Sequence, residues 1–555
     1  MPIGSQADRL PAAIERFLTK QDRAGRALCE RLASLGMSET FWRYLADANE
    51  EVLETFFSEL ARVDFDWLER HRSSLDASST IAVGKRPIQM VPLEPAVVIE
   101  KEKEELREAG WRSLVGGEWA EVVFAGGAGT RFQTGAGQSL PKGLHPLTPV
   151  MEISFLELFI RETLAAGIMC GRLPVVVLLT SSSTGAGISL WLDKSGLQGF
   201  PKEAIWELRQ AEHPRLDEDG NLIVDKYGHI IVTGDGHGGV FKALLGAPAD
   251  RLRRQGVRSL VLHNVDNAAA HPFDPVRLGF HRKQGFKMTL TAVERVGNEK
   301  VGLIGRDPKT GRVMVVEYSA CPEEVRTAKD SVGKPLFWLA HINTNLVELD
   351  AIRADLPATL YTDKRIIVSG RELTTSSLEM LNQSLAEMLP AETVGVLLVS
   401  RSDFFLPTKS LAGEDSLLQT RAALSRAALV RLRSNWAAVD DTAIIELDPC
   451  AGELDCRGWQ IGGGARLAVA VRHGEGSKPV IGAGLRLEPG ATLILETELP
   501  YGKVRYDPLT RAIGEDVASA GRISVGEGVR VRSGSFVRLC VEPGESIVVS
   551  DGEVL

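Results

Sequence analysis

Apolar residues recur at helical spacing over the first part of the chain. The positions that share this spacing are Leu28, Leu32 and Leu35, and then Leu53, Phe56, Phe57 and Leu60. Such a stripe covers one face of a helix and packs into a core, so residues 1–95 are expected to form an N-terminal helical region. The proline-containing stretch from Lys85 to Pro95 is expected to link this region to the next domain.

Between residues 96 and 440, short β-branched runs alternate with longer amphipathic segments. The expected strands are Glu121–Phe124, Val175–Thr180, Ser259–Asn264, Met288–Val293, Val313–Tyr318 and Val394–Ser400. Segments such as Phe155–Ala166 and Leu378–Met388 are expected to be helices. The alternation predicts an α/β domain with a mainly parallel sheet that helices cover on both faces. Ligands of such sheets bind at the carboxyl ends of the strands.

The pattern changes again in residues 441–555, where glycines are frequent and apolar runs are short. The segment GLRLEPGATLIL at 484–495 is echoed by VRLCVEPGESIVV at 537–549, and both turn on Glu-Pro-Gly. Short strands separated by glycine turns at a rough period predict a C-terminal all-β domain, either a β-solenoid or a small β-sandwich.

Composition narrows the class of protein. The chain has 555 residues, of which 44% are hydrophobic and 25% charged, and its formal net charge is −9. A mildly acidic chain has no field that attracts nucleic acid or a membrane surface, so neither is expected as a partner. Its six cysteines include one close pair, Cys450 and Cys456, which favours reduced thiols. The N-terminus lacks an apolar signal core and no apolar run approaches ~18 residues, so we expect a cytoplasmic protein.

The most informative stretch is VVFAGGAGTRFQTGAGQSLPKG at 122–143. A buried strand is expected to end at Phe124, and the glycine turn at 126–129 then exposes backbone N–H groups that suit a phosphate. Arg131 and Lys142 bring two cations to the same loop, as suits a triphosphate under attack. An ordinary strand–turn–helix connection with solvated charges is the alternative.

Spacing opposes two other kinds of glycine loop. A dinucleotide-binding loop needs a third glycine where this chain has Phe132, which argues against an oxidoreductase. An ATPase-type loop needs Ser or Thr after its lysine, but Gly143 follows Lys142.

Two further segments carry candidate chemistry. Asp266 follows an apolar strand and would face the phosphate loop, where a carboxylate can hold Mg²⁺; a helix N-cap is the alternative use. The segment Gly234–Gly239 has four glycines in six positions, which allows a close approach of the backbone to a ligand. A flexible surface loop is the alternative.

In this order the motifs resemble the signature of the UTP:sugar-1-phosphate uridylyltransferases, which include eukaryotic-type UDP-glucose and UDP-N-acetylglucosamine pyrophosphorylases. The matching segments are GGAGTR with PKG at 126–143, Gln210-x-x-x-Pro214, Gly-His-Gly at 236–238, Val-Asp-Asn at 265–267 and RSDFFLPTK at 401–409. The resemblance covers residues 95–425. Residues 133–139 make the connection to Lys142 a few residues longer than is usual in the family.

The resemblance implies an α/β nucleotidyltransferase that makes a UDP-sugar and pyrophosphate from UTP and a sugar 1-phosphate, with Mg²⁺ as cofactor. It implies that Arg131 faces the departing pyrophosphate, that Lys142 and Lys409 contact the phosphates, and that Asp266 holds the metal. The residues implied to bind UTP are Phe124, Ala125, Gly126, Gly127, Gly129, Gln210, Gly236 and Asp266. Those implied to bind the sugar phosphate are His237, Asn267, Glu317 and Asn343. The C-terminal β domain is expected to mediate self-association.

The motifs divide on the sugar. Glucose-specific members typically carry Gly-His-Gly and N-acetylglucosamine members Gly-Asn-Gly, so His237 favours glucose 1-phosphate, as does Asn-Thr-Asn at 343–345. The segment 409–421 is closer to the N-acetylglucosamine branch. We expect glucose 1-phosphate, with an N-acetylglucosamine or broad-specificity enzyme as the first alternative and a non-catalytic nucleotide-sugar sensor as the second.

Overall fold

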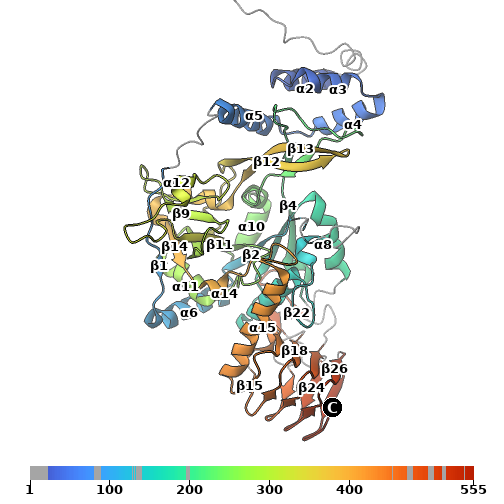
Figure 1. The fold of residues 1–555 in the computed structure, drawn as a ribbon, viewed down its shortest axis with the longest axis vertical. Coiled ribbons are helices and arrows are strands. Elements are labelled where there is room, and N and C mark those ends of the chain that lie inside the picture. The colour runs from blue at the N-terminus through green and yellow to red at the C-terminus, as the bar shows by residue number, and fades with distance from the viewer. Residues whose placement is uncertain are drawn as a thin grey trace, which may run out of the picture.

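The computed structural model describes residues 23–80, 89–127, 129, 132, 140–194, 200–452, 454–471, 479–497, 505–514, 521–542 and 544–555. Three regions follow one another along its long axis: helices near the N-terminus, an α/β domain, and a stack of short C-terminal strands (Figure 1). None of the described helices combines the length and apolar character needed to span a membrane. Cys170 and Cys456 carry free thiols.

The N-terminal layer consists of α2 (Arg23–Ser34), α3 (Glu39–Ala46), α4 (Glu50–Leu60) and α5 (Phe65–Thr80). The predicted stripe is confirmed, because Leu53, Phe56, Phe57 and Leu60 are buried. Ser38 and Asn49 cap α3 and α4 by accepting backbone N–H groups. The helices bury their apolar faces against Leu216, Leu222 and Ile230, so this layer rests on the chain between Gln210 and Gly236.

The central sheet has the order β1-β14-β8-β11-β7-β2-β3-β4. Its strands are β1 (Ala96–Val97), β2 (Trp119–Phe124), β3 (Val175–Thr180), β4 (Ile205–Arg209), β7 (Ser259–Asn264), β8 (Met288–Glu294), β11 (Leu339–Glu348) and β14 (Val394–Leu398). Within this order β11 is antiparallel to both neighbours and the other pairs are parallel. The hairpin of β9 (Gly302–Arg306) and β10 (Val313–Val316) joins β11 through β9. The mainly parallel sheet is confirmed.

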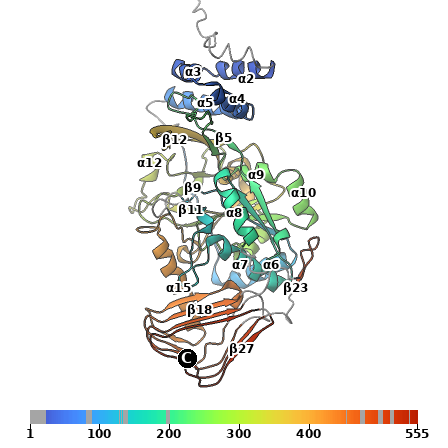
Figure 2. The same ribbon diagram turned by 90° about the vertical axis from the view of Figure 1, so that its right-hand side faces the viewer.

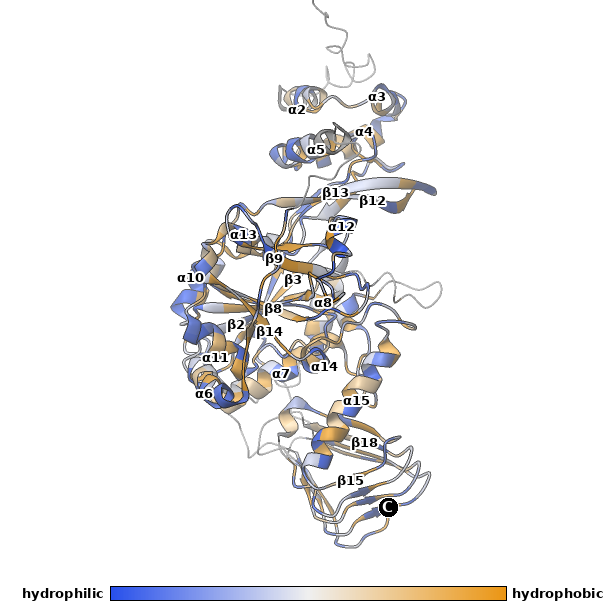
Figure 3. Cartoon of the chain, turned by 60° about the vertical axis from the view of Figure 1, so that its left-hand side comes forward, coloured by the Kyte–Doolittle hydropathy of each residue, from blue (hydrophilic) through white to orange (hydrophobic). Residues whose placement is uncertain are grey.

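Helices cover both faces of this sheet, and its strands form the apolar centre of the domain (Figure 3). Val122 packs with the side chains of α9 (Gly239–Leu244) and α10 (Ala247–Arg254), whereas Val123 packs with α7 (Phe155–Cys170) and α8 (Ser182–Lys194). Further helices are α6 (Glu100–Val115), α11 (Pro275–Gln284), α12 (Glu323–Arg326), α14 (Arg401–Phe404) and α15 (Leu417–Ser434). Alternate residues of β2 therefore enter two separate cores.

The helix predicted for 378–388 is wrong over most of its length. Residues 371–380 are β13 (Arg371–Met380), which pairs with β12 (Ala358–Val368) in a long ribbon, and helix is present only in α13 (Leu385–Met388). Leu378, Leu381 and Leu385 are buried as a helical stripe would be. Leu378 lies in β13, Leu381 precedes a short 3-10 turn, and Leu385 lies in α13. Pairing with β12 thus overrides the helical spacing of these leucines.

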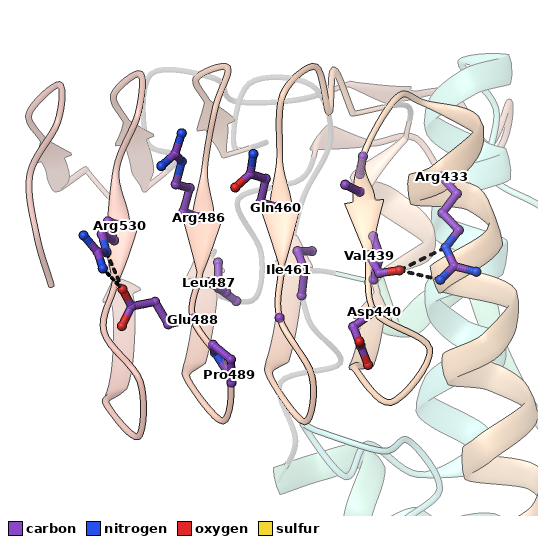
Figure 4. A pocket seen from close by; sticks show the side chains of 13 residues that line it. Arg433, Val439, Asp440, Gln460, Ile461, Arg486, Leu487, Glu488, Pro489 and Arg530 are labelled. Atoms are coloured by element: carbon purple, nitrogen blue, oxygen red, sulfur yellow. Dashed lines mark hydrogen bonds and ion pairs between the residues drawn. The ribbon is translucent and has the colours of Figure 1, made fainter.

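The C-terminal region is a β-solenoid, and the sandwich alternative is excluded. Its parallel sheets are β15 (Ala438–Val439), β17 (Gln460–Ile461), β20 (Arg486–Leu487) and β25 (Arg530–Val531); β16 (Ile444–Leu447), β18 (Arg466–Val471), β21 (Thr492–Thr497) and β26 (Phe536–Val541); and β19 (Val480–Ile481), β24 (Arg522–Val525) and β27 (Ser546–Val549). Gln460, Arg486 and Arg530 occupy equivalent positions on successive strands, along a surface groove of about 760 Å³ (Figure 4).

The repeated Glu-Pro-Gly turns lie at different corners of the solenoid. The first follows Leu487 and leads from β20 to β21, whereas Glu542 and Gly544 of the second lie between β26 and β27. The sequence echo therefore reflects a shared turn chemistry, and it does not give the register of the strands.

A hairpin from the solenoid region docks on the α/β domain. Its strands are β22 (Arg505–Tyr506) and β23 (Ile513–Gly514), and β23 lies beside α7 (Figure 2). Between them Arg511 is 0% exposed. Its guanidinium donates to the backbone carbonyl oxygens of Gly117, Trp119, Leu173 and Gln255. Arg511 thus supplies hydrogen-bond donors to the backbone carbonyls at the amino ends of β2 and β3.

Arg511→Ala is expected to lower the free energy of unfolding by about 3 kcal/mol, because it leaves several strand-end carbonyls without their donor. Denaturant unfolding of the full chain measures this change. Arg172→Ala is the matched control, since the Arg172 guanidinium bonds the single carbonyl of Gly116 in an exposed position. Equal midpoints for the two variants would contradict the anchoring role of Arg511.

Candidate functional site

The glycine loop lies at the carboxyl end of β2, between β3 and β7. The N–H of Ala125 donates to Leu179 O at 2.9 Å, and the Ser181 hydroxyl donates to Gly126 O at 3.0 Å. Among the described residues nothing lies within 4 Å of where a Gly127 Cβ would be, so the backbone here faces open space. Gly129 has φ +64°, and a Cβ there would come within 2.9 Å of Leu140 O. Position 129 therefore requires glycine, and no described residue covers Gly127 on its Cβ side.

Lys142 returns to this loop, as the sequence predicts. Its N–H donates to Gly127 O at 3.1 Å, and its ammonium lies 2.5 Å from Asp266 Oδ2. The residue is 9% exposed, and its ammonium is 5.3 Å from the centre of the Phe132 ring. A lysine held this firmly is a fixed point charge. Arg131 and residues 133–139 lie outside the described residues.

Asp266 stands two residues beyond the end of β7, where its carboxylate is 24% exposed. Within the described part of the chain, no group of three or more His, Cys, Asp or Glu side chains could cage a metal ion. A single carboxylate fits Mg²⁺, which commonly takes one or two protein carboxylates and completes its shell with water and substrate phosphates. The ammonium of Lys142 already places one cation against this carboxylate.

Asn267 has a structural task that differs from the predicted contact with sugar phosphate. Its amide donates to Phe404 O at 3.0 Å and accepts from the N–H of Leu406 at 2.8 Å. The side chain is buried and its amide is engaged by this loop. Asn267 therefore fixes the segment that leads to Lys409, and its contact with sugar phosphate stays a prediction.

Lys409 reaches the same site from that segment. The N–H of Thr408 donates to Asp266 O at 2.9 Å, which places Lys409 beside the proposed metal ligand. The Lys409 ammonium lies 2.7 Å from Asp415 Oδ2. The structure thus brings Lys142, Asp266 and Lys409 together from three separate parts of the chain.

Gln210 follows β4 and lies between two glycine segments. Its N–H donates to Thr180 O at 2.9 Å, which fixes the backbone. Its side-chain amide packs against Gly126 on one side and Gly234 on the other. Gly236 has φ +86°, and a Cβ there would meet Met380 O, so this position requires glycine. Gln210 consequently borders the glycine loop, as expected for a residue that contacts a base, whereas Gly236 packs against the end of β13.

His237 is a neutral donor. The backbone N–H of Asn382 donates to its Nδ1 at 3.1 Å, so Nε2 carries the proton of the neutral ring. Burial, and then the nearby His341, lower the pKa of His237 to about 3. The ring stacks on Phe124, with 5.0 Å between the ring centres. At neutral pH this side chain therefore presents an uncharged N–H group.

Asn343 belongs to a buried network of amides. Its Nδ2 donates to Asn264 Oδ1 at 2.9 Å, and its Oδ1 accepts from Asn382 Nδ2 at 2.7 Å. Asn345 donates to Asn382 Oδ1 and lies 3.0 Å from the Nε2 of His341. The network joins the end of β7, the middle of β11 and the segment that follows β13, and Asn382 connects it to His237.

A cavity of about 360 Å³ adjoins these groups. Its lining residues include His237, Asp266, Asn267, Glu317, Asn343 and Lys409. Glu317 Oε1 accepts from Gln383 Nε2 at 2.6 Å, and burial raises the pKa of Glu317 against the opposing effect of this bond. The cavity thus combines a cationic part with a part rich in carboxylate and amide acceptors.

Several lining residues were not predicted from the sequence, namely Asn264, His341, Tyr361, Glu379 and Gln383. Tyr361 and Glu379 come from the β12–β13 ribbon, and Gln383 follows it. A sequence signal for Gln383 was the polar Asn-Gln pair at 382–383, in a segment that also contains Glu379, Ser384 and Glu387. That signal is too weak to identify a pocket.

The segment after Lys142 is held by the solenoid and by α15. Glu446 of β16 accepts the N–H groups of Val150 and Met151, each at 2.8 Å. Arg421 of α15 donates to Leu147 O at 3.1 Å, and Arg466 of β18 donates to Pro149 O at 3.0 Å. The C-terminal region therefore helps to fix the path of the chain that leaves the site.

Comparisons with known proteins agree with this geometry. A sequence model of the UTP–glucose-1-phosphate uridylyltransferase family matches residues 79–450. The Saccharomyces cerevisiae UDP-N-acetylglucosamine pyrophosphorylase is 25% identical over 74% of this chain and 92% of its own length. A probable UDP-N-acetylglucosamine pyrophosphorylase of Dictyostelium discoideum is 26% identical over 45% of this chain and about half, 53%, of its own length.

Solved structures show the same fold. The Trypanosoma brucei UDP-N-acetylglucosamine pyrophosphorylase superposes with a TM-score of 0.63 at 20% identity, covering 81% of this chain and 94% of that one. A UDP-glucose phosphorylase of the same organism gives a TM-score of 0.51 at 15% identity, with 88% and 98% covered. Because the family model matches most of the chain, this protein belongs to the UTP–glucose-1-phosphate uridylyltransferase family.

Proposed function

We propose that this protein transfers a uridylyl group from UTP to a sugar 1-phosphate. The observation that carries the proposal is the meeting of Lys142, Asp266 and Lys409 at the carboxyl ends of the strands, beside both the glycine loop and the cavity. An oxygen of the sugar phosphate attacks the α-phosphorus of UTP, the α–β bond breaks, and pyrophosphate leaves. The sugar phosphate is already an anionic nucleophile, so alignment and charge neutralisation suffice.

The roles follow from position. Gln210 and Gly236 border the base, the backbone around Gly127 receives the phosphates, and Lys142 and Lys409 neutralise the charge that develops on them. Asp266 would hold Mg²⁺, which supplies further positive charge at the phosphates when it is bound. His237, Asn343 and Glu317 would contact the sugar phosphate.

The expectation of glucose 1-phosphate is not supported, and N-acetylglucosamine 1-phosphate is the better proposal. The two sequence relatives named above are a UDP-N-acetylglucosamine pyrophosphorylase and a probable one. His237 does not argue against them, since its neutral N–H can act as the donor that an asparagine amide would supply. The cavity beside Asn343 also has apolar side chains in its wall, Val301, Ile342, Leu381 and Phe405, which suit an acetyl group.

The value of kcat/KM is therefore expected to be at least ~10-fold higher with N-acetylglucosamine 1-phosphate than with glucose 1-phosphate, or about 1.4 kcal/mol of transition-state binding. Pyrophosphate release at saturating UTP measures both sugars side by side. Equal values would favour a broad-specificity enzyme, and a reversed preference would restore the glucose assignment. Tight UTP binding without pyrophosphate release from any hexose 1-phosphate would instead indicate a nucleotide-sugar sensor.

A further inference from the structure

Asp415 holds Lys409 at two points. The N–H of Lys409 donates to Asp415 O at 2.7 Å, and its ammonium lies 2.7 Å from Asp415 Oδ2. These contacts close a short loop, which is completed by the N–H of Leu417 donating to Ser410 O at 2.9 Å. Both the start and the end of the Lys409 side chain are thereby tied to one residue.

Asp415 itself is fixed by its surroundings. It directly precedes Ser416, the N-cap of α15, whose hydroxyl accepts from Gln419 N in a capping box. A carboxylate at this end of a helix is favoured by the helix dipole. The backbone of Asp415 has φ +50°, a conformation that Asp and Asn adopt more readily than other side chains. The residue is thus placed by the helix, and the conformation restricts its replacements.

The two side chains differ in their access to the cavity. Among the described residues, Lys409 lines the cavity wall and Asp415 does not. The ion pair is about one-third exposed on both sides, at 35% for Lys409 and 32% for Asp415. Asp415 can therefore act on a bound phosphate only through Lys409.

We propose that Asp415 is a positioning residue that holds the ammonium of Lys409 at the cavity wall before substrate arrives. The proposal rests on the uridylyl-transfer function given above. A free lysine samples many rotamers of its four-carbon stem, whereas a held one meets the phosphate without that ordering cost. Preorganised charge stabilises the transition state more than the ground state. Removing the Asp415 carboxylate should therefore lower kcat more than it weakens UTP binding.

Asp415→Asn is the main test, because Asn tolerates the same backbone conformation and keeps an acceptor while losing the charge. We expect kcat for pyrophosphate release to fall ~10-fold, with the UTP dissociation constant from calorimetry unchanged within ~2-fold. Glu414→Gln is the matched control, as Glu414 is the exposed neighbouring carboxylate, and it should keep kcat. If Asp415→Asn matches this control or raises kcat, Asp415 does not position Lys409.

A double-mutant cycle separates positioning from general structural support. In the Lys409→Ala background, adding Asp415→Asn should change kcat by less than ~2-fold, because the group that Asp415 acts through is gone. A second ~10-fold loss in that background would make Asp415 a structural residue and overturn the proposal.

Chemical labelling tests the ion pair without relying on activity. Mass spectrometry after treatment with an amine-reactive ester should show Lys409 modified several-fold faster in Asp415→Asn than in the wild type or in Glu414→Gln. Equal labelling rates would show that the pair does not form in solution. A wild type that releases no pyrophosphate but shows this labelling difference would count against the proposed function alone.

Discussion

Chelation of divalent metal with EDTA is expected to abolish pyrophosphate release, and Asp266→Asn is expected to lower kcat by at least ~10³-fold. The carboxylate lies at the end of β7 and beside the glycine loop, where triphosphate oxygens would complete a magnesium shell. Within the described residues there is no acidic cluster that could replace it. Initial rates with added Mg²⁺ and after chelation test the first part, and single-turnover rates test the second.

A binding measurement separates the metal role of Asp266 from its contact with Lys142. In the wild type, Mg²⁺ should tighten UTP binding in calorimetry, and this gain should disappear in Asp266→Asn. If Asp266 only holds the Lys142 ammonium, the gain will persist in the variant, because an Asn oxygen still accepts from Lys142. Asp403→Asn, which changes an exposed carboxylate on α14, should leave both kcat and the magnesium effect unchanged.

The strands and the position of the glycine turn after β2 could be predicted because their signals are local. The β-branched runs at 175–180 and 259–264 match the observed strands at both ends. Parallel strands present their carboxyl ends at one edge, which is why Gly127 and Asp266 could be expected to meet. The run Val122–Phe124 is β-branched and aromatic, and it is buried at the end of β2 as expected.

The part of the cavity that we propose binds the sugar could not be predicted, because it is built from long-range strand pairing. The β12–β13 ribbon brings Tyr361 and Glu379 to the cavity, yet Leu378–Met388 has a helical spacing of apolar residues. Likewise, nothing in the sequence relates Arg511 to the four carbonyls it contacts, since the nearest of them is more than 250 positions away. Contacts between residues this far apart in sequence depend on how the domains pack together, which no local sequence pattern indicates.

The role of His237 shows a different limit. Its residue type suggested glucose, but what a sugar meets depends on which nitrogen carries the proton and on the charge of the ring. Both are set by Asn382 and by burial, and neither can be read from the motif. If the proposed sugar site is correct, its specificity depends on the amide network around His237 as well as on the residue type at this position.

Lys142→Ala is expected to lower kcat by ~10²-fold or more, because it removes a fixed charge from the transition state. Lys142→Met is the better second variant, since it retains most of the stem that packs near Phe132 while losing the charge. Both variants should fold, and the magnesium effect on UTP binding should remain, as Asp266 then loses a competitor for its carboxylate.

The pair of outcomes for Lys142 and Asp266 tests how the site works. If the ammonium must leave Asp266 before metal and nucleotide bind, Lys142→Met should bind Mg²⁺ more tightly than the wild type while turning over ~10²-fold more slowly. Tighter metal binding with normal kcat would mean that Lys142 only balances the carboxylate. Weaker metal binding would mean that Lys142 holds Asp266 in its productive orientation. Calorimetric titration with Mg²⁺ measures metal affinity, which depends on the Asp266 carboxylate. Pyrophosphate release measures turnover, which depends on charge neutralisation at the phosphates. The two measurements together distinguish these cases.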